Sequence, residues 1–344
     1  MAARRKWNVA VMGALGMVGT EMIKTLERRD FPVEELRPLD VAQYVGQEVT
    51  FKGRTVEARP ANADNFTGID IALFSAGGAA SLELAPQAVA KGAVVIDNSA
   101  AWRMDPDCPL VVPEVNPGDL DWHQGIIANP NCSTIQMVVA LKPLHDRVRI
   151  QRIVVSTYQA TSGAGKKGTL DLENQVRGYV LEGRMPDPAA FTYPIAFNLI
   201  PQIDVFLDGG YTKEEIKMAN ETRKIIGDER IKVTATCVRV PVFFGHSESV
   251  NIQTGSKITA EQARSLLRTA PGVTVIDDPQ HSKYPMPALT EHTDSVYVGR
   301  IREDNTITNG LNLWIVADNV RKGAALNAVQ IAEELVRRDL VRVN

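Results

Sequence analysis

The chain has 344 residues, and its 38 basic and 41 acidic side chains give a net charge of −3. This length predicts about two domains, while 44% hydrophobic and 23% charged residues exclude a disordered or low-complexity chain. A net charge this close to zero argues against a protein that binds nucleic acid or membrane surfaces through bulk charge.

The three cysteines, Cys108, Cys132 and Cys237, are too few and too scattered for a disulfide framework. None has a second cysteine or a histidine at metal-ligand spacing, so no metal site is expected. No stretch approaches the ~18 apolar residues of a membrane span, and the basic start lacks the features of a signal peptide. We therefore expect a cytoplasmic protein without membrane contact.

The first third of the chain alternates short apolar runs with helical patterns. Strands are expected at residues 7–12, 36–41, 69–75 and 93–97, and helices at 17–29 and 81–91. This alternation is typical of parallel βαβ units.

The second half has a different pattern. A β-branched strand is expected at residues 150–159, helices at 166–182 and 212–226, and strands at 232–244, 297–302 and 308–317. Wider spacing and more alternation favour a mixed or antiparallel sheet with helices on one face. Residues 324–338 form one amphipathic helical stripe. The sequence thus predicts two α/β domains with a boundary near residue 130.

A glycine-rich loop follows the first expected strand and opens a helix. Gly13, Gly16 and Gly19 permit a tight turn that lets backbone N–H groups approach a pyrophosphate at the helix N-terminus. The GxxGxxG spacing is weak by itself, so a tight turn without a ligand remains an alternative. Asp40, at the end of the next expected strand, suits either a ribose 2′-OH contact or a turn. Ser75 and Gly77 end the third strand on the same sheet edge.

Cys132 precedes an apolar helical run at residues 135–144. Ser133 or Thr134 is expected to cap that helix, whose dipole favours a thiolate at its start. The thiol is either a nucleophile for acyl transfer or a small apolar residue at a helix start. Cys108 and Cys237 lack such a position and are interpreted as structural.

An arginine lies in a very apolar expected strand, and a histidine follows that strand. Burial of Arg239 is costly unless the guanidinium meets an anion, which is either a ligand or a structural carboxylate. Gly245 then turns the chain and presents His246, as a partner for the nucleophile or as an ordinary loop histidine.

With these residues in view, the chain resembles the aspartate-β-semialdehyde dehydrogenase family along essentially its whole length. Nine segments carry the resemblance in family order: Gly13–Gly19, Phe74–Gly78, Val95–Asp105, Val112–Pro117, Asn129–Thr134, Ser156–Gly165, Asn198–Asp204, Arg239–His246 and Asp318–Ala325. The resemblance implies a Rossmann-type dinucleotide-binding domain over residues 1–130, completed by a C-terminal helix at 320–344. It also implies a mixed-sheet α+β catalytic and dimerisation domain over residues 131–319, and a homodimer.

The implied reaction is reductive dephosphorylation of 4-phospho-aspartate to aspartate semialdehyde with NADPH, releasing inorganic phosphate. This reaction lies on the route to lysine, threonine and methionine. By resemblance, Cys132 attacks the acyl phosphate, His246 transfers a proton and Gln159 orients the acyl group. The resemblance further implies substrate contacts from Arg239 (α-carboxylate), Glu214 (amino group), Lys217 and Arg103 (phosphate) and Asn131. Without it, Glu214 and Lys217 read as a surface pair at i,i+3.

The implied cofactor contacts fall in two stretches of the sequence. The first comprises Gly13, Leu15, Gly16, Met17, Val18, Gly19, Asp40, Ser75 and Gly77, and the second comprises Ser162, Gly163, Gly165 and Asn319. One departure from the family pattern concerns the 2′-phosphate of NADP. Gln43 and Gln47 stand where cations are usual, and Asp40 adds negative charge. We therefore keep NADP as the family default and hypothesise a relaxed or NAD-leaning cofactor specificity.

Two alternatives remain open from the sequence. N-acetyl-γ-glutamyl-phosphate reductase performs the same chemistry on a longer, acylated substrate, but that family places Gly rather than Asn before the cysteine. A non-catalytic relative acting as a binding protein is expected to lack the nucleophile, whereas Cys132 is present.

Overall fold

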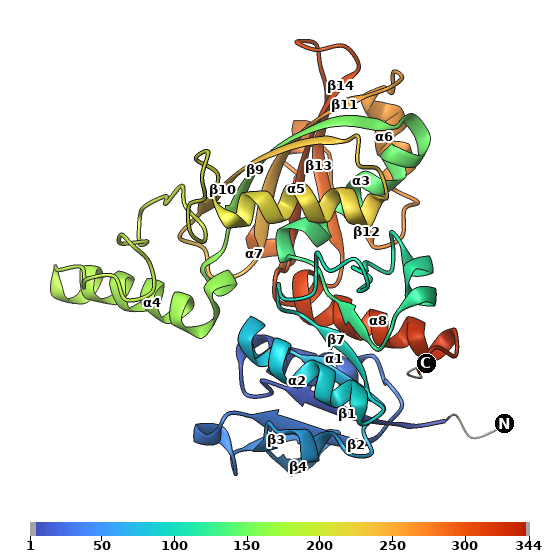
Figure 1. Cartoon of the computed structure of the whole chain (residues 1–344). Coiled ribbons are helices and arrows are strands. Elements are labelled where there is room, and N and C mark those ends of the chain that lie inside the picture. The colour runs from blue at the N-terminus through green and yellow to red at the C-terminus, as the bar shows by residue number, and fades with distance from the viewer. Residues whose placement is uncertain (1–4, 342–344) are drawn as a thin grey trace. The chain divides into compact units, whose positions relative to one another are not determined.

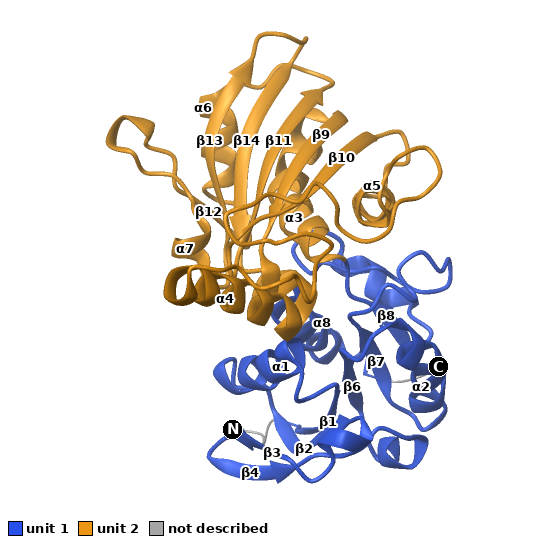
Figure 2. Cartoon of the chain, turned by 90° about the vertical axis from the view of Figure 1, so that its left-hand side faces the viewer, with its two compact units in different colours: residues 1–130, 324–344 blue, residues 131–323 orange. Residues whose placement is uncertain are grey.

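The computed structural model describes residues 5–341 and divides the chain into two compact units (Figures 1 and 2). Unit 1 comprises residues 1–130 and 324–344, and unit 2 comprises residues 131–323. Unit 1 is therefore discontinuous in sequence.

Unit 1 is built on a six-stranded sheet in which all neighbouring strands are parallel. Its order is β5 (Arg59–Pro60), β2 (Val33–Asp40), β1 (Trp7–Met12), β6 (Ile71–Phe74), β7 (Val94–Asp97) and β8 (Ile126–Ala128). Helix α1 (Met17–Arg28) follows β1, and α2 (Gly78–Ala90) follows β6. A separate hairpin is formed by β3 (Glu48–Phe51) and β4 (Arg54–Glu57). This arrangement confirms the expected parallel βαβ class.

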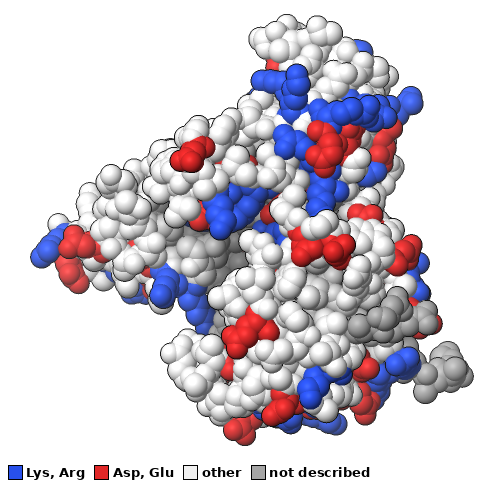
Figure 3. All heavy atoms as spheres, in the orientation of Figure 1, with Lys and Arg blue, Asp and Glu red and all other residues white. Residues whose placement is uncertain are grey.

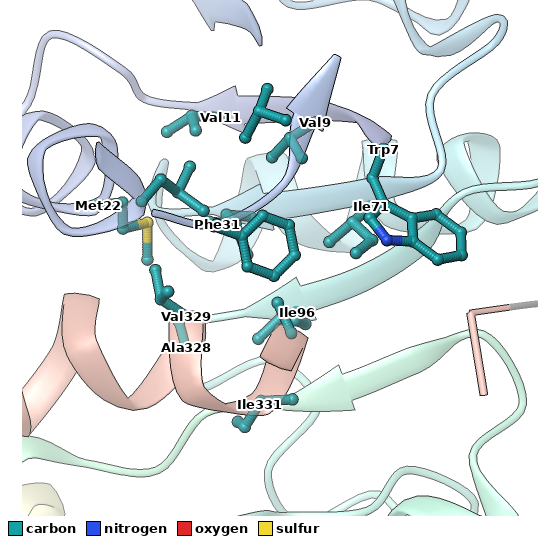
Figure 4. Packing of buried hydrophobic residues seen from close by; sticks show 14 of the residues in the cluster. Trp7, Val9, Val11, Met22, Phe31, Ile71, Ile96, Ala328, Val329 and Ile331 are labelled. Carbon is teal, nitrogen blue, oxygen red and sulfur yellow. The ribbon is translucent and has the colours of Figure 1, made fainter. Parts of the chain in front are cut away.

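The C-terminal helix α8 (Leu326–Arg337) supplies one wall of the unit 1 core. Its Ala328, Val329 and Ile331 are fully buried and pack with residues of β1, β6 and β7 (Figure 4). Helix α8 contacts α1 and β7 and lies within unit 1.

Unit 2 contains a six-stranded mixed sheet. Its order is β10 (Lys232–Arg239), β9 (Ile150–Gln159), β11 (His246–Thr254), β14 (Gly310–Ala317), β13 (Val296–Asp304) and β12 (Val273–Val275). The two outer pairs are parallel and the inner pairs antiparallel. Helices α3 (Cys132–Val148), α5 (Lys213–Ile226) and α6 (Ala260–Leu267) pack against it, and α4 (Gly165–Glu182) follows the end of β9.

Three sequence expectations about unit 2 were wrong in detail. The strand expected at 232–244 ends at Arg239, since Pro241 has no N–H to continue the ladder. A central strand, β11, was not expected, because its mixed polar residues give no apolar alternation. Helix α3 begins at Cys132 rather than at Ile135, which places the thiol in its first turn.

No helix of residues 5–341 is long and apolar enough to cross a membrane. On the face shown in Figure 3, acidic and basic side chains are interspersed.

Candidate functional site

In unit 1, the loop between β1 and α1 requires glycine for close packing. A Cβ on Gly13 would lie 2.4 Å from the Ser75 carbonyl oxygen, and Gly13 has a φ of +77°. A Cβ on Gly19 would lie 2.0 Å from the Gly13 carbonyl oxygen. No side chain caps α1 at Gly16, so the N–H groups of the first turn, which includes Met17 and Val18, remain for an anion. These features fit the pyrophosphate of a dinucleotide.

A cavity of about 580 Å³ lies beside this loop. Asp40 lines it, and its carboxylate accepts hydrogen bonds from the backbone N–H groups of Leu15 (2.9 Å) and Val41 (2.8 Å). Glu83 is a second acid in the lining, which contains no cation. The remaining lining residues are Met12, Gly13, Ala42, Val45, Pro60, Ala61, Ala76, Ala80 and Leu84. The cavity fits an adenosine, and the negative charges of Asp40 and Glu83 in its lining would repel a 2′-phosphate.

Other unit 1 residues from the sequence analysis have local roles in the fold. Ser75 continues the strand by donating its backbone N–H to the Met12 carbonyl, and Gly77 has a φ of +85° before α2. The Arg103 guanidinium is buried and donates to the carbonyl oxygens of Asn129 (3.0 Å) and Asn98 (2.9 Å). Arg103 therefore supports the end of unit 1 that leads into Cys132.

In unit 2, the helix that carries Cys132 is capped by Asn131, which corrects the expectation of a Ser133 or Thr134 cap. The Asn131 side-chain oxygen accepts from the backbone N–H groups of Ser133 (3.0 Å) and Thr134 (3.3 Å). The Asn131 amide nitrogen donates to Glu214, and its backbone N–H donates to Glu221. Two buried glutamates thus fix the residue before the thiol.

The backbone of Gly323 lies directly against Cys132. A Cβ on this glycine would stand 2.8 Å from Cys132 Cβ and 3.2 Å from its Cα. Cys132 is itself only partly exposed. The glycine thus leaves space for the thiol-bearing residue, a constraint that the sequence pattern did not reveal.

Gln159 and Glu214 lie in one buried hydrogen-bonded chain with Asn131. The Gln159 amide donates to the same Glu214 oxygen that accepts from Asn131, at 3.2 Å and 2.8 Å. Glu214 is 6% exposed, so its interpretation as half of a surface pair was wrong. Lys217 lies 3.3 Å from Glu214 and 2.7 Å from Asp204. Burial lowers the pKa of Lys217, but these carboxylates outweigh that effect and raise it.

Arg239 and His246 are both held by the backbone of Ala160. Arg239 Nη1 donates to the Ala160 carbonyl oxygen at 2.7 Å, and the Ala160 N–H donates to His246 Nδ1 at 3.0 Å. No carboxylate of residues 5–341 pairs with Arg239, which excludes the structural carboxylate pair within that range. Burial lowers the pKa of the guanidinium, while Cys132 and Glu214 act in the opposite direction. An anionic ligand therefore suits this position.

The protonation state of His246 follows from its surroundings. Burial, followed by the charge of Arg239, holds the imidazole pKa well below its usual value, so the ring is neutral at pH 7. Because Nδ1 accepts the Ala160 N–H, the ring proton resides on Nε2. Nε2 is buried and has no hydrogen-bond partner among the described residues. His246 is thus arranged as a hydrogen-bond donor through its Nε2–H.

The segment after Gln159 brings further predicted residues to this region of unit 2. A Cβ on Gly163 would lie 2.6 Å from Arg239 Nη1 and 3.3 Å from His246 Nε2. Ser162 and Asn319 exchange hydrogen bonds at 3.0–3.1 Å, and Asn319 also accepts from the Gly245 N–H. Gly165, with a φ of +72°, opens α4. These contacts make Ser162 and Asn319 structural ties between segments distant in sequence.

The other two cysteines agree with their structural interpretation. Cys108 is buried in unit 1, and burial raises the pKa of the Cys237 thiol far above its usual value. Among residues 5–341, no group of three His, Cys, Asp or Glu side chains is arranged to hold a metal ion.

Comparison with protein families matches both halves of the chain. Residues 8–123 match the semialdehyde dehydrogenase NAD binding domain, and residues 141–322 match the semialdehyde dehydrogenase dimerisation domain. The protein is therefore an oxidoreductase of the semialdehyde dehydrogenase class.

Individual relatives narrow this class. Aspartate-semialdehyde dehydrogenase of Aquifex aeolicus is 58% identical over 338 residues, covering 97% of this chain and 99% of the relative. The Bacillus subtilis enzyme is 51% identical, with coverage of 98% and 99%. The crystal structure of aspartate semialdehyde dehydrogenase II from Vibrio cholerae has a TM-score of 0.94 at 49% identity, with coverage of 97% and 99%. The chain belongs to the aspartate-semialdehyde dehydrogenase family.

The contact of Gly163 with Arg239 and His246 yields a first prediction. Gly163→Ala should lower kcat by about tenfold to a hundredfold, because the added Cβ displaces Arg239 and His246, and a displacement near 1 Å is enough to slow a reaction that depends on their positions. Gly118→Ala is the matched control, since a Cβ there meets nothing within 4 Å. Steady-state kinetics of both variants provide the measurement. Equal activity of the two would contradict the proposed crowding.

Proposed function

We propose that this protein catalyses the NADPH-dependent reductive dephosphorylation of 4-phospho-L-aspartate to L-aspartate 4-semialdehyde. The observation that carries this proposal is the set of side chains gathered in unit 2 around a helix-start thiol. These are a neutral histidine, a buried glutamate and a buried arginine that pairs with no carboxylate of residues 5–341.

In the first step, the Cys132 thiolate attacks the acyl carbon of the substrate. The new C–S bond forms as the C–O bond to phosphate breaks, and inorganic phosphate leaves. The position at the start of α3 supports this role, because the helix dipole favours a negative sulfur. Gln159 orients the acyl group through its side-chain amide, which is itself fixed by a hydrogen bond to Glu214.

In the second step, the thioester is reduced and the aldehyde is released. The reduced nicotinamide, when bound, supplies the hydride. His246 donates a hydrogen bond from its Nε2–H to the resulting oxyanion on the Cys132 adduct and stabilises its negative charge. The proton stays on Nε2 as the oxyanion collapses, the C–S bond breaks, and the aldehyde and the Cys132 thiolate are released. The Ala160 N–H supports this role by fixing the tautomer.

Substrate recognition is assigned to the charged side chains of unit 2. The planar guanidinium of Arg239 suits the substrate α-carboxylate. Glu214, oriented by Asn131 and Gln159, suits the free amino group. Lys217 suits the phosphate, and we propose the same role for Arg103. A buried carboxylate for an amino group disfavours an N-acetylated substrate.

The function is tested by the reverse reaction, phosphate-dependent reduction of NADP by aspartate semialdehyde. Wild-type protein should turn over, and Cys132→Ala should lower kcat by at least about 10³-fold because the thioester is not formed. Cys237→Ser, the matched control, should stay near wild type because that thiol is buried and protonated. Turnover of only the N-acetylglutamate analogue, or full activity of Cys132→Ala, would reject the proposal.

The adenosine cavity in unit 1 defines the cofactor proposal. The fold supports a pyrophosphate at the start of α1, and we propose NADP with NAD as an alternative cofactor. Ser162, Gly163, Gly165 and Asn319 are assigned to the nicotinamide end by resemblance only.

Replacing Asp40 should change cofactor preference. Asp40→Asn retains an acceptor for the Leu15 N–H but removes a negative charge from the lining. The ratio of kcat/KM for NADPH over NADH should rise at least about fivefold, because the variant removes the negative charge that repels the 2′-phosphate of NADPH. Asp64→Asn, an exposed acid outside the cavity, is the control. An unchanged ratio would show that Asp40 does not face the 2′ position.

We further propose that the protein is a cytoplasmic homodimer assembled through unit 2. Helix α4 and the segment after it expose large apolar side chains, among them Val180 (67%), Leu181 (75%) and Phe197 (65%). Exposed apolar groups of this density mark an interaction surface in a soluble domain. The family description of residues 141–322 as a dimerisation domain supports a second copy as the occupant.

Leu181→Asp should disrupt this dimer because it places a charge among apolar groups that lose contact with water on association. Sedimentation should show wild type at twice the mass of one chain and the variant shifted toward monomer. Leu82→Asp, at a 56% exposed position of α2, is the control and should leave the mass unchanged. A monomeric wild type would refute the assembly.

A further inference from the structure

Glu248 is a completely buried acid that the proposed reaction does not use. It lies on β11, two residues after His246, and is 0% exposed. No donor among residues 5–341 makes a well-formed hydrogen bond to either carboxylate oxygen, although the Gln136 amide interacts with the carboxylate, and no cation of those residues pairs with it. An ionised carboxylate in this state is very costly.

The groups around Glu248 do little to stabilise its ionised carboxylate. Strand pairing sets Thr157 of β9 and Ile315 of β14 opposite it. On β10, the titratable group that interacts electrostatically with Glu248 is the Cys237 thiol. On α5, Glu214 and Glu215 interact electrostatically with the same thiol. His246 is the nearest titratable side chain on its own strand. Burial raises the pKa of Glu248 well above its usual value, and the Gln136 amide opposes this without overcoming it.

Gln136 links Glu248 to the two reacting side chains. It lies on α3, one turn after Cys132, and its Nε2 donates to the backbone carbonyl of His246 at 3.3 Å. Its side-chain oxygen is buried and has no donor among the described residues. An ionised Glu248 would add only further acceptors, whereas a protonated carboxyl supplies the missing O–H donor. One proton thus satisfies Glu248 and Gln136 together.

We propose that Glu248 functions as a neutral carboxylic acid that donates to Gln136, and that this pair fixes the His246 strand against the Cys132 helix. Glu248 is a positioning residue in this scheme, since it acts through Gln136 and touches no reacting atom. The inference deepens the proposed function and rests on it for the roles of Cys132 and His246.

The protonation state is tested by stability as a function of pH. A folded-state pKa above that of the unfolded chain means that the folded state binds more protons, so wild type loses stability as pH rises from about 5. Glu248→Gln has no such proton. The wild-type unfolding constant, divided by that of Glu248→Gln, should therefore rise about tenfold per pH unit between pH 5 and the folded-state pKa.

A matched substitution on α5 provides the contrast. Glu215 accepts the backbone N–H groups of Cys237 and Thr212, so Glu215→Gln should lower stability. If the ratio for Glu248→Gln does not rise with pH, or if this variant is uniformly less stable than wild type, Glu248 is ionised and the inference fails. Because unfolding does not require turnover, this failure is distinguishable from failure of the proposed function.

The positioning role is tested by kinetics. Glu248→Gln keeps a neutral hydrogen-bonding side chain and should hold kcat within about threefold of wild type. Glu248→Leu removes the donor and should lower kcat at least about tenfold with little change in KM, because geometry rather than binding is lost. Equal losses of kcat in both variants, or no loss in Glu248→Leu, would overturn the role.

Discussion

The backbone of Ala160 is the constraint on which the arrangement of unit 2 depends. Its carbonyl holds the Arg239 guanidinium, its N–H holds the His246 imidazole, and the preceding residue is Gln159. Backbone groups at the end of a strand are set by the sheet, so their positions vary less than those of side chains. Three polar side chains therefore inherit their geometry from the point where β9 leaves the ladder with β10 and β11.

A second set of buried polar groups is hydrogen-bonded to Gln159 and to the start of helix α3. Glu214 accepts from both Asn131 and Gln159, and Glu221 accepts from the backbone of Asn131. The helix start that presents Cys132 is thus fixed by carboxylates behind it. Such networks are costly when incomplete, which makes a single misplaced proton consequential.

Local patterns predicted much of this molecule. The parallel class of unit 1 follows from apolar runs alternating with helical spacing, and the amphipathic stripe of α8 follows from residues 324–338. What the pattern missed depends on long-range contact. The strand β11 is polar in sequence and is buried by its neighbouring elements, so no apolar pattern marks it. The Asn131 cap is hidden in the sequence because the adjacent Ser133 and Thr134 are equally suitable capping residues. Likewise, Glu214 looks like a surface residue until β9 and α3 are placed beside it.

The chain order of the two units also affects how the protein is made. One side of the unit 1 core is formed by residues of helix α8, which follow Gly323 in the chain, whereas unit 2 is complete by Gly323. During synthesis, the first segment of unit 1 must wait until helix α8 has been made before its interior closes. Unit 2 has no such delay. A chain released just after Gly323 has a whole inserted unit, whereas its outer unit has an open apolar core and is a substrate for chaperones and proteases.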